Sequence, residues 1–150
     1  MWPDSDVEEL VTGEYIPVRV HVRDQADEFQ RLGEEYGAHW TPSVLMLDPS
    51  GEERHRMEGF VPVKEFIPNL ELGLARVDFS GGRYDEAESR FRHIVDNHPD
   101  TNVAPDALYW AGVSRYKATD DPAALQETAA ALNEKYPDSQ AATKGSVWQG

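Results

Sequence analysis

The sequence contains no cysteine. Disulfide bonds, thiol catalysis and thiolate metal sites are therefore excluded within these 150 residues. Basic residues are scarce as well, because 14 Lys and Arg stand against 28 Asp and Glu and give a formal charge of −14 at pH 7. A field of that sign repels phosphate backbones, so we expect no nucleic-acid partner. The lack of cysteine leaves the cytoplasm and the periplasm both open, and we expect a cytoplasmic protein.

Long apolar runs and catalytic motifs are also missing. No stretch approaches the ~20 apolar residues that span a bilayer, so we expect no membrane partner, and no signal peptide is visible. The serines lack the G-x-S-x-G context of a nucleophile. The five histidines are not spaced as a ligand set, and His93 and His98, five residues apart, are expected on different faces of a helix. We therefore expect no catalytic residue, no metal and no cofactor in this chain.

A strand–turn–strand pattern organises the first half. Residues 44–47 are apolar without alternation, which is typical of a strand covered on both faces. Asp48-Pro49-Ser50-Gly51 then places Asp, Pro and Gly where a type I turn favours them. Residues 53–59 alternate between two faces, His55 and Met57 on one, and Arg54, Arg56 and Glu58 on the other. Together these patterns predict a β-hairpin.

A second alternating segment precedes the hairpin. Residues 16–23 place four β-branched side chains on one face and the remaining residues on the other: Ile16, Val18, Val20 and Val22 against Pro17, Arg19, His21 and Arg23. This pattern predicts a strand with one well-buried face. With the helix that follows it and the hairpin, the segment predicts a right-handed βαβ unit with an added antiparallel strand.

Three helices are predicted around these strands. The first covers residues 4–14, and the second runs from an Asp24 cap to about Tyr36. The third covers residues 61–79, where Pro68 either kinks the helix or separates a first turn from it.

The second half of the sequence repeats itself. A shift of 38 residues lays residues 84–112 on residues 122–150, so that Trp110 falls on Trp148 and Gly112 on Gly150. A fixed period in this range is the signature of stacked helix–turn–helix units. The pattern predicts four helices, over residues 83–97, 102–117, 122–135 and 139–148. Ser80-Gly81-Gly82 is a clear break, so we predict two domains, residues 1–79 and residues 80–150.

Residues 4–79 resemble the second half of the thioredoxin fold. The order strand, helix, Thr-Pro, strand, D-P-x-G turn, strand and long helix carries the resemblance. Trp40-Thr41-Pro42 stands where that family has its cis-proline loop. The resemblance implies a partial thioredoxin-like mixed sheet with flanking helices and a cis Thr41–Pro42 bond. The family's Cys-x-x-Cys and its opening strand, helix and strand are absent, which is a large departure.

In that fold one of the absent strands lies between the two parallel strands that are kept here. Three outcomes are open: residues 16–22 pair directly with residues 44–47, a strand is taken from another molecule, or the chain is a fragment. Because an unfilled gap exposes strand edges that pair with other chains, a homodimer through the unpaired edge is one expectation.

Residues 80–150 resemble tetratricopeptide repeats. The segments that carry the resemblance are Gly82-Arg83-Tyr84-Asp85-Glu86-Ala87, Tyr109-Trp110-Ala111-Gly112 and Tyr136-Pro137-Asp138-Ser139. Such repeats usually bind proteins or peptides, and thioredoxin domains joined to them occur among bacterial redox and chaperone-like proteins. The two resemblances together imply a fold class of α/β plus all-α, in which a partial thioredoxin-like domain precedes helical repeats.

Two functions from different classes follow. The first, which we favour, is a redox-silent binding module for a protein or peptide in a chaperone-like or scaffold-like role. The second is the C-terminal remainder of a thiol–disulfide oxidoreductase whose Cys-x-x-Cys segment lies upstream of Met1. The predicted peptide-binding residues are Trp40, Thr41 and Pro42 at a cis-proline shelf, and Tyr109, Arg115 and Tyr116 in a repeat groove. A rigid strand entrance with Trp40 as half-buried packing is the alternative for the shelf.

Overall fold

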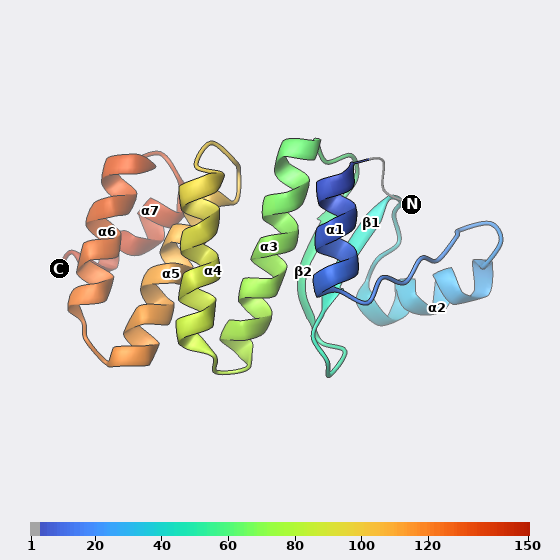
Figure 1. Ribbon diagram of the computed structural model, residues 1–150, viewed down its shortest axis with the longest axis horizontal. Coiled ribbons are helices and arrows are strands. Elements are labelled where there is room, and N and C mark those ends of the chain that lie inside the picture. Colours follow the sequence, from blue (N-terminus) through green and yellow to red (C-terminus); the bar gives the residue numbers. More distant parts are fainter. Residues whose placement is uncertain (1–3) are drawn as a thin grey trace. The chain divides into compact units, whose positions relative to one another are not determined.

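The computed structural model of the chain describes residues 4–150. Its elements are α1 (Ser5–Glu14), α2 (Ala26–Tyr36), β1 (Ser43–Leu47), β2 (Glu53–Glu58), α3 (Val63–Ser80), α4 (Tyr84–Asn97), α5 (Ala104–Thr119), α6 (Ala123–Lys135), α7 (Gln140–Gly145) and the short 3-10 helix η1 (Ser146–Trp148) (Figure 1). The chain divides into two compact units, the first ending at Ile67 and the second beginning at Pro68. An α/β part followed by helices alone confirms the predicted fold class. The predicted domain boundary between residues 79 and 80 stays a prediction.

Helix α1 begins and helix α2 ends as the sequence leads one to expect. The Asp4 carboxylate accepts hydrogen bonds from the N–H groups of Asp6 and Val7, at 2.9 and 3.3 Å, and so caps α1. Gly37 follows α2 with a φ of 63°, the left-handed conformation in which a residue without Cβ meets no steric penalty.

The start of α2 differs from the prediction. Gln25 occupies the N-cap position, and no side chain caps the helix. The Asp24 carboxylate lies 3.1 Å from Nδ1 of His21, within a turn in which the Gln25 N–H donates to the His21 carbonyl oxygen at 2.8 Å. The predicted Asp24 cap is wrong because this turn engages the carboxylate before the helix begins.

Residues 16–22, termed the valine segment, form no strand. Ile16 is 93% exposed and Val18 is 82% exposed. The sheet contains β1 and β2 alone, in antiparallel order, so neither the predicted third strand nor the right-handed βαβ unit forms within residues 4–150. Alternation gives the segment a face that a sheet would bury, but a strand also needs a neighbour for its N–H and C=O groups.

Strands β1 and β2 form the predicted hairpin. The Gly51 N–H donates to the Asp48 carbonyl oxygen at 2.9 Å and closes the turn. The register pairs β1 with β2 as Ser43–Glu58, Val44–Met57, Leu45–Arg56 and Met46–His55, and after a β-bulge as Leu47–Glu53. Arg54 is the extra residue of the bulge. The bulge brings Glu53 onto the face of Arg56, because residues three apart on a regular strand lie on opposite faces.

Strand β1 is less covered than its composition predicts. Met46 and Met57 are buried on one face of the hairpin. Val44 and Leu45 are half-buried, and Leu47 is 38% exposed. The expectation of a strand covered on both faces is therefore wrong.

The helices of the second unit follow the predicted repeat. Helices α4, α5 and α6 lie within about two residues of their predicted bounds, and the fourth predicted helix is divided into α7 and η1. Helix α3 runs through Pro68 without interruption, which excludes a separate first turn. Phe91, Ile94 and Leu132 are fully buried at the centre of the core.

Helices α5 and α6 approach each other closely at Gly112. A Cβ on Gly112 would lie 2.0 Å from Oγ1 and 2.6 Å from Cβ of Thr128. The Thr128 hydroxyl donates to the Ala124 carbonyl oxygen at 2.7 Å, which fixes its orientation. This crossing therefore accepts only glycine at position 112.

None of the helices within residues 4–150 combines the length and the apolar character that crossing a membrane requires. The cytoplasmic location stays a prediction.

Candidate functional site

The sequence singles out the connection between α2 and β1, residues 38–42, termed the Trp40 loop. Its first end is held against α2, because the Ala38 N–H donates to the Gly33 carbonyl oxygen at 3.0 Å. A Cβ on Gly33 would lie only 3.1 Å from the Ala38 carbonyl oxygen, so the loop passes close to the helix. Its second end is held to the hairpin by the Gly59 N–H, which donates to the Pro42 carbonyl oxygen at 2.8 Å.

Between these two anchors the loop faces solvent. The Trp40 side chain is 73% exposed, and Thr41 and Pro42 are exposed as well. The Thr41–Pro42 bond is cis, as predicted. The Ser43 hydroxyl donates to the Trp40 carbonyl oxygen at 2.7 Å, whereas the Thr41 N–H and C=O form no hydrogen bond within the part of the chain described. The loop thus presents an aromatic ring beside free main-chain polar groups.

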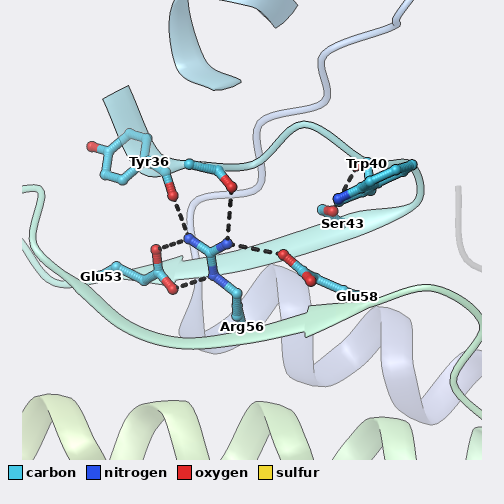
Figure 2. A network of polar contacts seen from close by, with 7 residues as sticks. Tyr36, Trp40, Ser43, Glu53, Arg56 and Glu58 are labelled. Atoms are coloured by element: carbon cyan, nitrogen blue, oxygen red, sulfur yellow. Dashed lines mark hydrogen bonds and ion pairs between the residues drawn. The ribbon is translucent and has the colours of Figure 1, made fainter. Parts of the chain in front are cut away.

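Arg56 on β2 fixes the end of α2 from which the loop leaves. Its Nε and Nη2 donate to the two carboxylate oxygens of Glu53, and its Nη1 donates to Glu58 Oε1 at 2.9 Å (Figure 2). The guanidinium also donates to the carbonyl oxygens of Tyr36 and Gly37. These carbonyls lie at the C-terminus of α2, where the helix leaves C=O groups unpaired and its dipole favours a cation.

The carboxylates of this network keep the Arg56 guanidinium charged. Hydrogen bonds to Glu53 first, and then to Glu58, raise the pKa of the Arg56 guanidinium above its ordinary value. The Tyr36 hydroxyl donates to the Gly51 carbonyl oxygen in the hairpin turn at 3.0 Å, and burial raises the pKa of that hydroxyl. The end of α2 is therefore tied to the hairpin at two points, through Arg56 and through Tyr36.

Arg56 escapes prediction from the sequence. Its place in the alternation groups it with Arg54 and Glu58 as an ordinary polar face. The available signal is an arginine with Glu53 three residues before it and Glu58 two residues after it. That signal becomes a three-residue cluster only through the bulge, which the sequence does not reveal.

The predicted groove residues, Tyr109, Arg115 and Tyr116, all lie on α5. Tyr109 and the half-buried Tyr116 are seven residues apart and so share one side of the helix. Tyr109 stacks on Trp148, with ring centroids 4.7 Å apart. Arg115 points elsewhere, with Nη1 3.7 Å from Glu127 Oε2 of α6. The structure therefore places the two tyrosines on one side of α5 and Arg115 beside Glu127 of α6.

Two histidines of the second unit converge, against expectation. His93 Nε2 lies 3.3 Å from Glu71 Oε1, and His98 Nε2 lies 3.4 Å from Glu71 Oε2. His98 follows the end of α4 with φ −132° and ψ 49°, so helical spacing does not govern its direction. The prediction that the two side chains turn to different faces is wrong. Across residues 4–150, no group of His, Asp and Glu is arranged so that it could hold a metal ion.

Comparison with protein families bears on both units. Residues 1–73 match the family model of the thioredoxin-like domain, and residues 70–101 and 106–139 match that of the tetratricopeptide repeat. Both resemblances drawn from the sequence are confirmed. The first match includes the Trp40 loop and Arg56, and the second includes the three predicted groove residues. No curated protein and no solved structure matches the chain.

Proposed function

We propose that this chain, in which a thioredoxin-like domain precedes tetratricopeptide repeats, is a binding module for an extended segment of another protein. The observation that carries the proposal is the Trp40 loop. An exposed indole supplies rigid apolar contact area, and the adjacent Thr41 N–H and C=O supply main-chain hydrogen bonds to an extended peptide. Trp40, Thr41 and Pro42 are the binding residues of this shelf.

The support beneath the loop favours binding. The hydrogen bonds at Ala38 and Gly59 hold the two ends of the loop, and Arg56 holds the end of α2 from which it leaves, so little conformational entropy is lost on association. Thiol chemistry has no residue to carry it in these 150 residues, because they contain no cysteine. The charge of −14 favours cationic segments as ligands. A redox-silent, chaperone-like or scaffold-like role fits these properties.

Selection of peptides from a random display library against the full chain tests the shelf. Trp40→Ala is expected to weaken the selected peptides by about 30-fold, the effect of removing a hot-spot tryptophan. Phe60→Ala is the matched control, because Phe60 is 89% exposed in the same unit outside the loop. Full affinity in the Trp40 variant, or equal losses in both variants, would show that the loop is not the site.

A second binding surface is proposed on α5. Tyr109 and Tyr116 share one side of the helix, and Lys144 Nζ lies 5.9 Å from the centre of the Tyr109 ring, which adds a cation beside the aromatic pair. Alanine at Tyr109, Arg115 and Tyr116 together should abolish binding of peptides that the Trp40 variant still binds. Tyr109→Phe keeps the stack on Trp148 and serves as the control. Unchanged affinity in the triple variant refutes this assignment.

A further inference from the structure

We propose that two copies of this chain associate by strand exchange, in which the valine segment of each copy pairs with the open edge of β1 in the other. The partner is a second copy of the same chain, and the interface is main-chain hydrogen bonding between strands. The inference goes beyond peptide binding, since it uses neither the Trp40 ring nor the repeats.

Strand β1 has a partner on one edge only. The hydrogen bond from the Gly59 N–H to the Pro42 carbonyl fixes the alternation along the hairpin. In this alternation the N–H and C=O groups of the even-numbered β1 residues point towards β2. Those of Ser43 and Leu45 face the opposite edge, where they form no main-chain hydrogen bond within residues 4–150. An edge of this kind is a template for another strand.

The valine segment has one edge that is blocked and one that is free. Pro17 has no N–H to donate. The His21 N–H donates to Gln25 Oε1 at 2.9 Å, and the His21 carbonyl oxygen accepts from the Gln25 N–H at 2.8 Å. Both main-chain groups of His21 are therefore engaged in the turn that follows. The other edge carries the peptide groups of Val18 and Val20, which form no hydrogen bond in the described structure. Pairing with β1 therefore runs through Val18 and Val20.

The apolar side chains of the segment gain from this pairing. Ile16, Val18 and Val22 are exposed, and all are β-branched residues that fit the pleated surface of a sheet. On α2 the apolar residues Phe29 and Leu32 are only half-buried. A third strand beside β1 widens the sheet, and its β-branched side chains then have apolar neighbours to pack against.

Charge favours a second copy as the occupant. The valine segment and the next residue contain Arg19 and Arg23 and no acidic residue. The rest of residues 4–67 carries four Lys and Arg against fifteen Asp and Glu. The segment is thus a basic strand in an otherwise acidic unit, and its pairing with a second copy offsets part of the repulsion between two anionic chains.

Reciprocal exchange also ends the sheet on the β1 side, whereas β2 has no second neighbouring strand within residues 4–150. Two-fold symmetry fills both open β1 edges at once. The blocked edge, with Pro17, then faces outward and cannot accept a third chain. The expected product of exchange through β1 is a two-fold dimer and not an open chain of copies.

Sedimentation velocity of the full chain, from about 1 to about 200 µM, is the first test, and a concentration-dependent dimer is expected. Val18 is exposed, and Val18→Pro removes the N–H that would pair with β1 of the other copy in the proposed dimer. It should raise the dimer dissociation constant about 30-fold or more, because the symmetric dimer loses the bond twice. Arg19→Pro acts on the blocked edge and is the matched control, with an expected change below about fivefold. Arg19→Gln measures the part of that change due to charge.

Amide hydrogen exchange gives an independent readout. The N–H groups of Val18, Val20 and Leu45 should become protected as the dimer forms, whereas Phe60→Lys should leave the dimer intact. Four results overturn the proposal: a monomer at every concentration, equal effects of the two proline variants, a dimer in which these amides stay unprotected, or loss of the dimer in the Phe60 variant.

Discussion

The two units of the molecule differ in how much of their apolar surface they bury. Within residues 4–150, seventeen apolar residues are buried in the second unit and five in the first. Seven of the eight large apolar side chains that are exposed lie in the first unit. The second unit therefore completes a core of its own, and the first is held in part by polar contacts around Arg56.

The difference follows from the partners that each kind of element needs. A repeat helix buries its apolar face against the next helix in the same unit. A strand presents N–H and C=O groups on both edges, and within residues 4–150 β1 and β2 each have a neighbour on one edge only. The helices of the second unit therefore bury more apolar residues within the chain than the hairpin and helices of the first unit do.

Removing a core side chain from the second unit should give the largest effect. Phe91→Ala deletes a fully buried ring and should lower the free energy of unfolding by about 3–5 kcal/mol. Phe60→Ala removes the same ring from an 89% exposed position in the first unit and should change it by less than about 0.5 kcal/mol. Denaturant unfolding followed by circular dichroism measures both. Similar losses in the two variants would contradict the contrast drawn between the units.

Gly112→Ala should destabilise the second unit by about 2–3 kcal/mol, because the new methyl group meets the Thr128 side chain. The gain in helix propensity, about 1 kcal/mol, is too small to offset the clash. Denaturant unfolding measures the loss. Thr128→Gly in the same chain should restore part of it, whereas Thr128→Ala should not, since the Thr128 Cβ already lies 2.6 Å from the new atom.

A glycine-to-alanine substitution in the first unit should change the free energy of unfolding in the opposite direction. A Cβ on Gly13, near the end of α1, meets nothing within 4 Å. Gly13→Ala should therefore raise the free energy of unfolding by up to about 1 kcal/mol. Destabilisation at Gly13, or stabilisation at Gly112, would reverse the comparison.

Arg56→Gln tests the polar support of the first unit. The variant loses the bonds to Glu53 and to the end of α2, and should cost about 1–2 kcal/mol. Arg56→Lys keeps the charge but not the planar fork, so it should recover little. Amide exchange in the Trp40 loop should quicken in both. Arg31→Gln, which breaks exposed pairs with Glu28 and Glu35, should leave loop exchange unchanged.

The smallest expected effect is a dependence on acid at the hairpin turn. Hydrogen bonds from the Ser50 hydroxyl first, and then from Arg54 and main-chain N–H groups, lower the pKa of Asp48 from 3.8 to about 2. Because the folded pKa is the lower one, the stabilisation is complete above the ordinary pKa and is lost as the pH falls through 2. A carboxyl titration followed by NMR measures this pKa. Asp48→Asn should remove this part of the pH dependence, and an ordinary pKa for Asp48 would contradict the role of these bonds.

Much of the fold could be predicted because it is local. Apolar periodicity located the helices, and the 38-residue shift located the repeat. Asp48-Pro49-Ser50-Gly51 located the hairpin turn, and Trp40-Thr41-Pro42 marked the loop that the structure leaves exposed. These features depend on residues a few positions apart, so the sequence carries them directly.

Local sequence patterns were sufficient to predict most of the elements, the repeat and the candidate loop. Three features follow from the three-dimensional fold instead: the valine segment is unpaired, a bulge aligns Glu53 with Arg56, and Gly112 lies against Thr128. Alternation shows which face of a segment can be buried, but hydrogen bonding and burial require a neighbour. The segment that pairs with a given strand is set by contacts between residues far apart in the chain, and a local sequence pattern does not contain these contacts.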